Sequence, residues 1–193
     1  MALGSSAWKR DTLASSANCG RFPFVKAEPE TLPLAERARE PIRRAAQMEA
    51  DYSVESLAAV DHFLRTLPAA KPEKVAETAD QIGCYFGEVL RRALGAQWQG
   101  SPAEEPRDWR LVFDAVPLSI SPVGMAAQAI YEDEIGEYDG ALDVPVTLRG
   151  ALERALEAMG EVDEAYYYSL TGRFETIQHV LDVLVAGKQQ RPS

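Results

Sequence analysis

Apolar residues recur every three or four positions over most of the chain, a spacing that places them on one face of an α-helix. Residues 34–50 are rich in helix-forming residues, but Pro41 lies inside them, so we expect a kink or a new start there. Residues 51–67 also have an apolar face, and Asp51 and Ser53 are candidate N-caps. Two helices are therefore predicted in this part of the chain.

A longer helix is predicted over residues 72–94, opened by Pro72 and followed by Gly95 as a left-handed cap. Gly83 and Gly87 fall on the apolar face of this helix. A glycine inside a helix costs roughly 1 kcal/mol relative to alanine. We therefore expect both glycines to mark the close approach of another element.

The period changes after Trp98. Residues 109–115 alternate apolar and polar side chains, and Leu118 and Ile120 follow after Pro117. Alternation of this kind predicts strands, arranged as a short hairpin or bent ribbon with Trp98 near its entrance.

Helical spacing returns in the last part of the chain. One helix opens at Pro122, a second is predicted over residues 144–159 with Asp143 as its cap, and the last covers residues 171–187. Three consecutive tyrosines, residues 166–168, precede the last helix and cannot all face the core. We expect one or two of these rings to fill the core, with their hydroxyl groups at its rim.

These elements predict a predominantly α-helical α+β fold, with about six helices around a small two- or three-stranded antiparallel sheet. The chain has 193 residues, of which 46% are apolar, enough to bury one core. We expect an irregular N-terminal arm over residues 1–33, a single globular domain over 34–187 and a tail over 188–193.

The charge of the chain is unevenly distributed. Acidic residues outnumber basic ones by 30 to 20, and residues 104–164 contain 15 acidic and 4 basic residues. An acidic field opposes direct contact with a phosphate backbone or an anionic membrane, so we expect neither nucleic acid nor a membrane as a partner. Such a field suits a basic protein partner.

The sequence also indicates the compartment. No stretch approaches the roughly 18 consecutive apolar residues of a membrane-spanning helix, and the charges of Lys9, Arg10 and Asp11 fall where a signal peptide needs apolar residues. The two cysteines, Cys19 and Cys84, are far apart and have no redox or metal spacing, which suits a reducing compartment. We therefore expect a cytoplasmic protein.

The densest acidic stretch is YEDEIGEYDGALD, residues 131–143. It does not follow the ligand register of an EF-hand, and three interpretations stay open: a solvated loop, a calcium site and a surface for a basic partner. Tyrosines beside acidic residues can anchor a protein interface. The candidate partner-binding residues are Tyr131, Glu132, Asp133, Glu134, Glu137, Tyr138 and Asp139.

A second candidate polar site lies on the 72–94 helix and consists of Tyr85, Glu88 and Arg92. Glu88 projects to the face opposite the glycines, and Arg91 and Arg92 follow three and four residues later, in the order that favours helix ion pairs. A solvated ion pair and a functional carboxylate both fit this pattern.

The string GCYFGEVLRRALGAQW, residues 83–98, precedes a tryptophan-containing strand, an apolar strand and a helix opened by proline. This arrangement resembles a bacterial family of unknown function, over residues 51–170. The resemblance implies helices around a small sheet, and it implies no activity. The residues that support it are Gly83, Tyr85, Gly87, Glu88, Val89, Arg92, Gly95 and Trp98.

Common catalytic and cofactor motifs do not occur in the sequence. It contains no GxSxG, GxxxxGK[ST] or GxGxxG pattern, and its two histidines, His62 and His179, have no second ligand at metal-binding spacing. We therefore predict no metal and no cofactor.

These features predict a non-enzymatic, adaptor- or immunity-like binding module whose acidic second half docks a basic protein partner. Two alternatives stay open. One is an enzyme with a site of scattered residues near Glu88, between the glycine-containing helix and the sheet. The other is a structural subunit of a homo- or hetero-oligomer, because Trp8, Phe22 and Phe24 of the N-terminal arm need a place to be buried.

Overall fold

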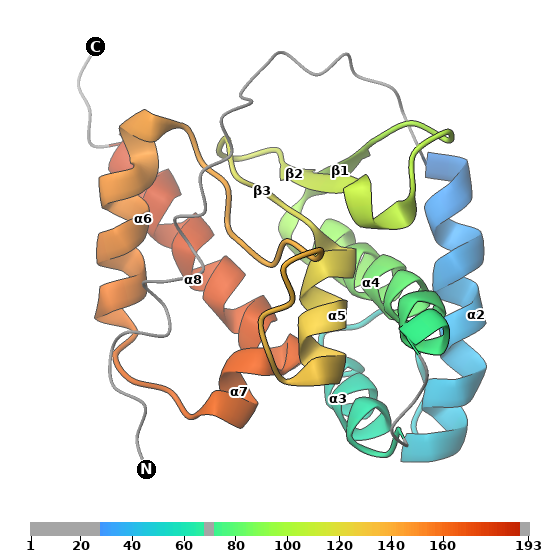
Figure 1. Cartoon of the computed structure of the whole chain (residues 1–193). Helices are drawn as coiled ribbons and strands as arrows, with labels where there is room; N and C mark the ends of the chain where they lie inside the picture. Colours follow the sequence, from blue (N-terminus) through green and yellow to red (C-terminus); the bar gives the residue numbers. More distant parts are fainter. Residues whose placement is uncertain (1–27, 68–71, 190–193) are drawn as a thin grey trace.

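The computed structural model describes residues 28–67 and 72–189 (Figure 1). Within these ranges, seven α-helices and a 3-10 turn surround a three-stranded antiparallel sheet, so the predominantly helical α+β fold is confirmed. None of the helices in these ranges is long and apolar enough to cross a bilayer. Residues 1–27 of the predicted arm and 190–193 of the predicted tail lie outside the described residues.

The elements follow one another in a simple order along the chain (Figure 1). The α-helices are α2 (Glu28–Ala46), α3 (Leu57–Arg65), α4 (Pro72–Leu94), α5 (Pro122–Tyr131), α6 (Val146–Ala158), α7 (Glu164–Tyr168) and α8 (Leu170–Gln189). The 3-10 turn η1 (Pro106–Asp108) lies between the strands β1 (Ala96–Gln99) and β2 (Arg110–Phe113), and β3 (Ser119–Ile120) completes the sheet.

Helix α4 lies at the centre of the fold, with its main contacts to α2 and α5 (Figure 1). All residues from Ile82 to Leu90 are buried, so this part of the helix is covered on every side. The predicted bounds, Pro72 and Leu94, are the observed ones, and Gly95 takes the left-handed conformation with φ +69°.

The two glycines of α4 both mark a close approach, as predicted. A Cβ atom on Gly83 would overlap the backbone of Val123 in the first turn of α5, so the two helices cross in contact there. A Cβ atom on Gly87 would overlap the indole ring of Trp98. Gly83 therefore sets the distance between two backbones, whereas Gly87 makes room for a side chain.

The sheet has the order β1-β2-β3, and Leu111 in its central strand pairs with Trp98 on one side and Ile120 on the other. Trp98 is thus part of a strand, although it was expected only near the entrance of the sheet. Strand β1 has the sequence AQWQ, in which buried apolar residues alternate with glutamines, but four residues are the shortest run that indicates a strand.

The first two helices differ from their predicted bounds. Helix α2 begins at Glu28, inside the segment expected to be irregular, and it continues through Pro41, which lies on its exposed side. Helix α3 begins at Leu57 instead of residue 51. The Asp51 carboxylate accepts the backbone N–H of Ser53 at 3.0 Å and so forms a turn where periodicity predicted helix.

The last helices also correct the prediction. Asp143 does not cap α6; it forms a β-bridge with Ser119, and the N-cap position is Pro145. The tyrosines at 166–168 belong to α7, a helix of five residues that is too short to show a periodic pattern. Tyr167 and Tyr168 are buried, which agrees with the expectation that one or two rings fill the core.

Candidate functional site

In the predicted polar site, Tyr85 and Glu88 are buried, whereas Arg92 is exposed. Glu88 has 4% of its surface exposed and does not face the solvent as predicted. Its carboxylate accepts a hydrogen bond from Nε1 of Trp98 at 3.1 Å and three from the Arg91 guanidinium at 3.0 to 3.2 Å. Nε of Arg92 lies 3.6 Å away. The ion pairs were predicted correctly, but a helix covered on every side has no solvent face here.

Arg92 and Tyr85 lie on either side of a second aromatic ring, that of Tyr52. The guanidinium carbon of Arg92 is 4.1 Å from the centre of this ring, and Tyr85 stacks on it with ring centres 4.7 Å apart. The Tyr52 hydroxyl donates to Glu36 at 2.7 Å. Burial, followed by this hydrogen bond, raises the pKa of Tyr52 far above its usual value.

The hydroxyl of Tyr85 is also engaged. It accepts the backbone N–H of Tyr52 at 3.1 Å and lies 2.7 Å from the hydroxyl of Ser56. We call Glu36, Tyr52, Tyr85, Glu88 and Arg92 the Glu88 cluster. The cluster joins three parts of the chain: α2, α4 and the turn that precedes α3. Through Trp98 it also contacts β1.

The side chains of the Glu88 cluster are engaged with one another and with their neighbours in the chain. A catalytic carboxylate must reach a substrate proton, and both oxygens of Glu88 already accept hydrogen bonds. Glu36 of the cluster lines an open depression beside α2, but Glu88 and Tyr85 line neither this depression nor the small cavity near Glu132. The neighbouring thiol of Cys84 is buried, and burial raises its pKa far above the usual range, so it is no thiolate nucleophile at neutral pH.

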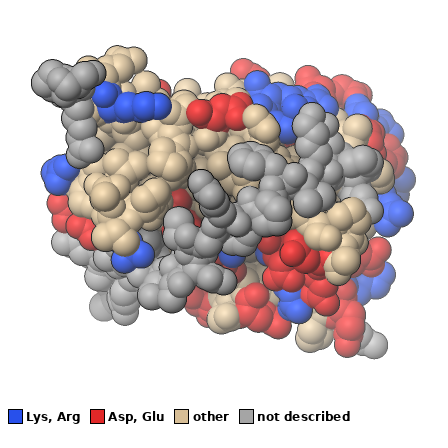
Figure 2. Space-filling view, turned by 90° about the horizontal axis from the view of Figure 1, so that it is seen from above, with Lys and Arg blue, Asp and Glu red and all other residues tan. Residues whose placement is uncertain are grey.

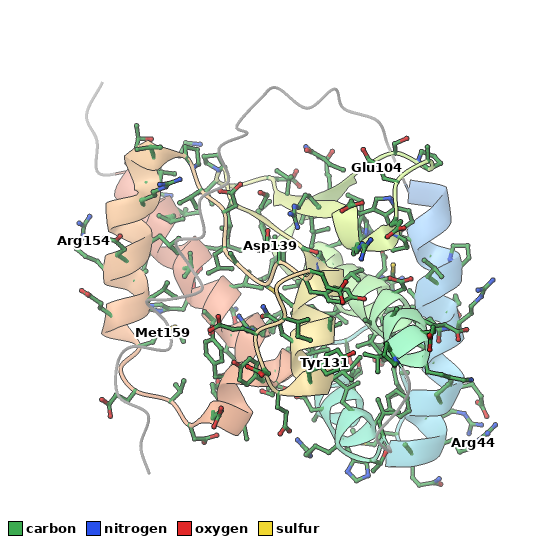
Figure 3. All side chains as sticks on the ribbon, viewed as in Figure 1. Arg44, Glu104, Tyr131, Asp139, Arg154 and Met159 are labelled. Atoms are coloured by element: carbon green, nitrogen blue, oxygen red, sulfur yellow. The ribbon has the colours of Figure 1, made fainter. Side chains whose placement is uncertain are left out.

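The acidic loop, residues 131–143, runs back along α5 (Figure 3). Tyr131 ends the helix, and Asp139 lies close to the first turn, where a Cβ atom on Gly124 would overlap the Asp139 carbonyl group. The loop ends in the bridge of two backbone hydrogen bonds, each 2.9 Å long, between Asp143 and Ser119. It is therefore fastened along α5 and at the edge of the sheet.

Tyr138 fastens the middle of the loop. It was predicted as part of the binding surface, but it is buried, with 9% of its surface exposed. It packs in a small apolar cluster whose other buried members are Ala79, Val123 and Ala127. The pattern of acidic residues around Tyr138 gave no sign of this, because the apolar partners come from α4 and α5.

A buried polar contact supports the same part of the loop. Gln128 of α5 lies against Gly140, where a Cβ atom would overlap its side-chain amide. Its oxygen accepts a hydrogen bond of 2.9 Å from Arg173 of α8, whose guanidinium carbon lies 4.4 Å from the centre of the Tyr167 ring. The loop, α5 and α8 are thus joined through one amide side chain.

Two acidic side chains of the loop are paired with arginines of the chain itself. Asp139 pairs with Arg110 at 2.9 Å, and Glu137 lies 3.7 Å from Arg107, which also pairs with Glu105 at 2.6 Å. These arginines belong to η1 and β2, about thirty positions before their partners, and sequence spacing alone does not reveal such pairs. The acidic surface is therefore shorter than predicted.

The beginning of the loop contains two acidic side chains outside these pairs. We call Tyr131, Glu132 and Asp133 the Tyr131 segment. The Tyr131 side chain is 44% exposed, and Glu132 ends α5 in the left-handed conformation, with φ 51°. Within the described residues, neither Glu132 nor Asp133 forms an ion pair. Glu134 is exposed as well.

Asp80 of α4 lies near the charges of Glu105 and Arg107. No sequence pattern identified it as a candidate site residue. Burial, followed by the charge of Glu105, raises its pKa to about 6, and Arg107 opposes this shift. Burial is the main cause of the raised pKa of Tyr138, and the charges of Glu137 and Asp80 raise it further. Asp80 therefore titrates near neutral pH.

Two hollows lie near the candidate sites. An open depression beside α2 is lined mainly by Glu36, Arg39, Glu40 and Arg43, which are paired with one another along the helix. The other is a small cavity of about 60 Å³ next to the Tyr131 segment, and its walls include Glu132. The small cavity is the hollow that adjoins a candidate binding surface.

Charges of both signs share the surface of the molecule. Acidic and basic side chains are interspersed on the face of the molecule seen from above (Figure 2). In the described ranges, no group of three or more histidine, cysteine or acidic side chains has the geometry to hold a metal ion.

No protein-family model, no characterised protein and no solved structure matches this chain. The resemblance to a bacterial family therefore stays a prediction, and the functional argument rests on the geometry of the chain.

Proposed function

We propose that this chain is a non-enzymatic binding module that docks a basic protein partner at the Tyr131 segment. The observation on which the proposal rests is a 44% exposed tyrosine followed by Glu132 and Asp133, which have no ion-pair partner within the described residues. An exposed aromatic ring can cover the aliphatic part of a lysine or arginine, and a neighbouring carboxylate can bind its charged end.

The rest of the acidic loop takes a secondary part in this proposal. Glu137 and Asp139 already bind Arg107 and Arg110, so a partner gains little from them unless it displaces these arginines. They still contribute to the acidic field that steers a basic partner toward the loop, an effect that weakens as salt rises.

The anchoring of the loop favours binding. Tyr138 is packed in a small core, Asp139 lies against Gly124, and Asp143 is bridged to the sheet. A segment that is already ordered loses less conformational entropy when it binds. The Tyr131 segment is thus presented to a partner in a defined position at the end of α5 (Figure 3).

The two alternatives receive less support. An enzyme centred on Glu88 would need an accessible carboxylate, and the Glu88 carboxylate is buried and engaged with Trp98 and Arg91. Oligomerisation through the N-terminal arm concerns residues 1–27, which lie outside the described residues.

The test is affinity capture from a lysate of the native cells, at low and at high salt. The loop variant Glu132→Gln/Asp133→Asn removes two charges from the Tyr131 segment. The control variant Glu153→Gln/Asp182→Asn removes two charges from exposed positions on α6 and α8. Both variants change the net charge equally, so a loss seen only with the loop variant reports the local surface.

The proposal expects a stoichiometric basic protein that the wild type and the control variant retain at low salt. The loop variant should lose this protein, and high salt should weaken its retention by the wild type. The proposal is overturned if no such protein is captured, or if both variants lose it equally.

A further inference from the structure

The small cavity beside the Tyr131 segment lies where helices end. Leu64 and Arg65 are the last residues of α3, and Ala129 and Ile130 belong to the last turn of α5. The carbonyl end of a helix has a partial negative charge, because its last carbonyl groups have no donor within the helix. Two helices therefore direct their negative ends toward one hollow.

The two helix ends differ in how they are capped. The carbonyl group of Phe63, near the end of α3, accepts the backbone N–H of Thr66 at 3.0 Å. Among the described residues, no backbone N–H from outside α5 donates to the carbonyl groups of Ala129 and Ile130. The end of α5 beside the cavity thus has no backbone cap from the described part of the chain.

The charged side chains around the cavity are mostly acidic. The Asp61 carboxylate, only 6% exposed, accepts the backbone N–H of Leu170 at 2.8 Å and that of Thr171 at 3.1 Å, so it offsets the positive end of α8. Glu132 is exposed and has no ion-pair partner within the described residues. Among the described residues, Arg65 is the one basic residue that lines the cavity, and it is exposed. The side chains and helix ends around the cavity together have a net negative charge.

The size and the walls of the cavity restrict what it can hold. A volume of about 60 Å³ has room for a few atoms beyond a single water molecule. Leu64 and Ala165 supply apolar wall, and the buried Tyr168 lines the cavity as well. A methylene group with a terminal ammonium matches this combination. A lysine ammonium is compact and has three donors, whereas a guanidinium is a larger planar fork.

We propose that this cavity is the receptor for the side-chain end of a lysine from the basic protein partner. The inference rests on the proposed function and adds the residue that is recognised. The ammonium group donates to the carbonyl end of α5 and pairs with Glu132, while Tyr131 covers the outer part of the lysine chain.

The first experiment uses n-butylammonium chloride as the probe, with the full chain followed by ¹H–¹⁵N NMR. We expect saturable shifts of the amide signals of Ala129, Ile130 and Ser169, and no such shifts with sodium chloride or n-butanol at equal concentration. The variant Ala129→Leu fills the cavity, and Glu132→Gln removes the carboxylate while leaving the wall intact. Each should weaken probe binding about tenfold.

The matched control is Ala186→Leu, at an exposed position near the end of α8. It makes the same substitution away from the cavity, and it should leave binding unchanged. Thermal unfolding of each variant shows whether it is folded; if Ala129→Leu is not, Glu132→Gln alone decides. Unchanged probe binding in a folded cavity variant, or absence of saturable shifts in the wild type, overturns the inference.

A second experiment separates this inference from the proposed function. The affinity of the captured basic protein is measured for the wild type, Ala129→Leu and Ala186→Leu. About tenfold weaker binding to Ala129→Leu alone supports a lysine in the cavity. If the partner binds all three equally, the cavity inference fails and the proposed function stands. If no basic protein binds the wild type at all, the proposed function fails, and with it the inference that rests on it.

Discussion

The indole N–H of Trp98 donates a 3.1 Å hydrogen bond to the buried carboxylate of Glu88, and the ring lies where Gly87 has no side chain. One residue of β1 is thereby fixed to two positions of α4, by packing at Gly87 and by charge at Glu88. The hydrogen bond also satisfies an indole donor that would otherwise be buried without an acceptor. This contact fixes the sheet against the central helix.

Substitution of the glycines of α4 should destabilise the fold. We expect Gly83→Ala and Gly87→Ala each to lower the free energy of unfolding by about 2 kcal/mol, because an added Cβ overlaps Val123 or Trp98. Gly187→Ala is the control, because nothing lies within 4 Å of a Cβ at that position of α8. It should stabilise by about 0.5 kcal/mol through helix propensity. Urea unfolding measures all three, and equal effects at all three positions would refute the close approach.

Loss of the Glu88 carboxylate should cost stability. Glu88→Ala leaves the buried Trp98 N–H without an acceptor and should lower the free energy of unfolding by about 2 kcal/mol. Glu88→Gln keeps an oxygen acceptor, so its cost should be about half as large. Urea unfolding with tryptophan fluorescence is the measurement. If both variants are as stable as the wild type, the cluster is not structural and the enzyme interpretation regains weight.

The sequence predicted most elements whose signal is local. The helix from Pro72 to Leu94 was predicted to the residue, because proline, a long apolar face and Gly95 agree there. Helix α7 contains too few residues to show a period, and β1 alternates over only four residues. Periodicity also assigns one buried face to a helix, so it could not show that α4 is covered on every side at Glu88.

The candidate surface was predicted in its location and not in its extent. Seven residues of the acidic loop were candidates, and Glu137 and Asp139 turn out to be paired with arginines from distant parts of the chain. Tyr138 turns out to be buried by apolar residues of α4 and α5. A count of charges along the sequence compares only residues that are close in the sequence. It cannot predict ion pairs between distant residues, because the fold brings these residues together.

The stability of the protein should depend on the protonation of Asp80. Its pKa is raised from 3.8 to about 6 in the folded chain, so the folded state favours the protonated form. The penalty for the charged form is therefore present above about pH 6 and disappears as the pH falls toward 4. Because Asp80 is partly exposed, solvent screening limits this penalty to about 1 kcal/mol.

Asp80→Asn should accordingly be more stable than the wild type by about 1 kcal/mol near pH 7.5, and the difference should vanish near pH 4. Urea unfolding at a series of pH values gives both curves. Asp182→Asn, at an exposed position of α8, is the control and should show no such pH-dependent gain. A gain for Asp80→Asn that does not change with pH would contradict the raised pKa.

Glu132 offers a test that separates stability from binding. It holds the left-handed conformation at the end of α5, with φ 51°, which costs a non-glycine residue about 1 kcal/mol. Glu132→Gly should therefore raise the free energy of unfolding by about 0.5 to 1 kcal/mol, because glycine adopts this conformation without a steric penalty. The same change removes a carboxylate from the Tyr131 segment, so it should weaken binding of a basic partner.

Glu132→Gln provides the comparison, because it loses the charge and keeps the side chain that strains the backbone. Thermal unfolding should show stabilisation for Glu132→Gly alone, whereas partner affinity should fall by a similar factor in both variants. Such a result would mean that the residue is kept at this position for its charge, at a cost in stability. If the glycine variant weakens binding and the glutamine variant does not, the shape of the loop and not its carboxylate would determine recognition.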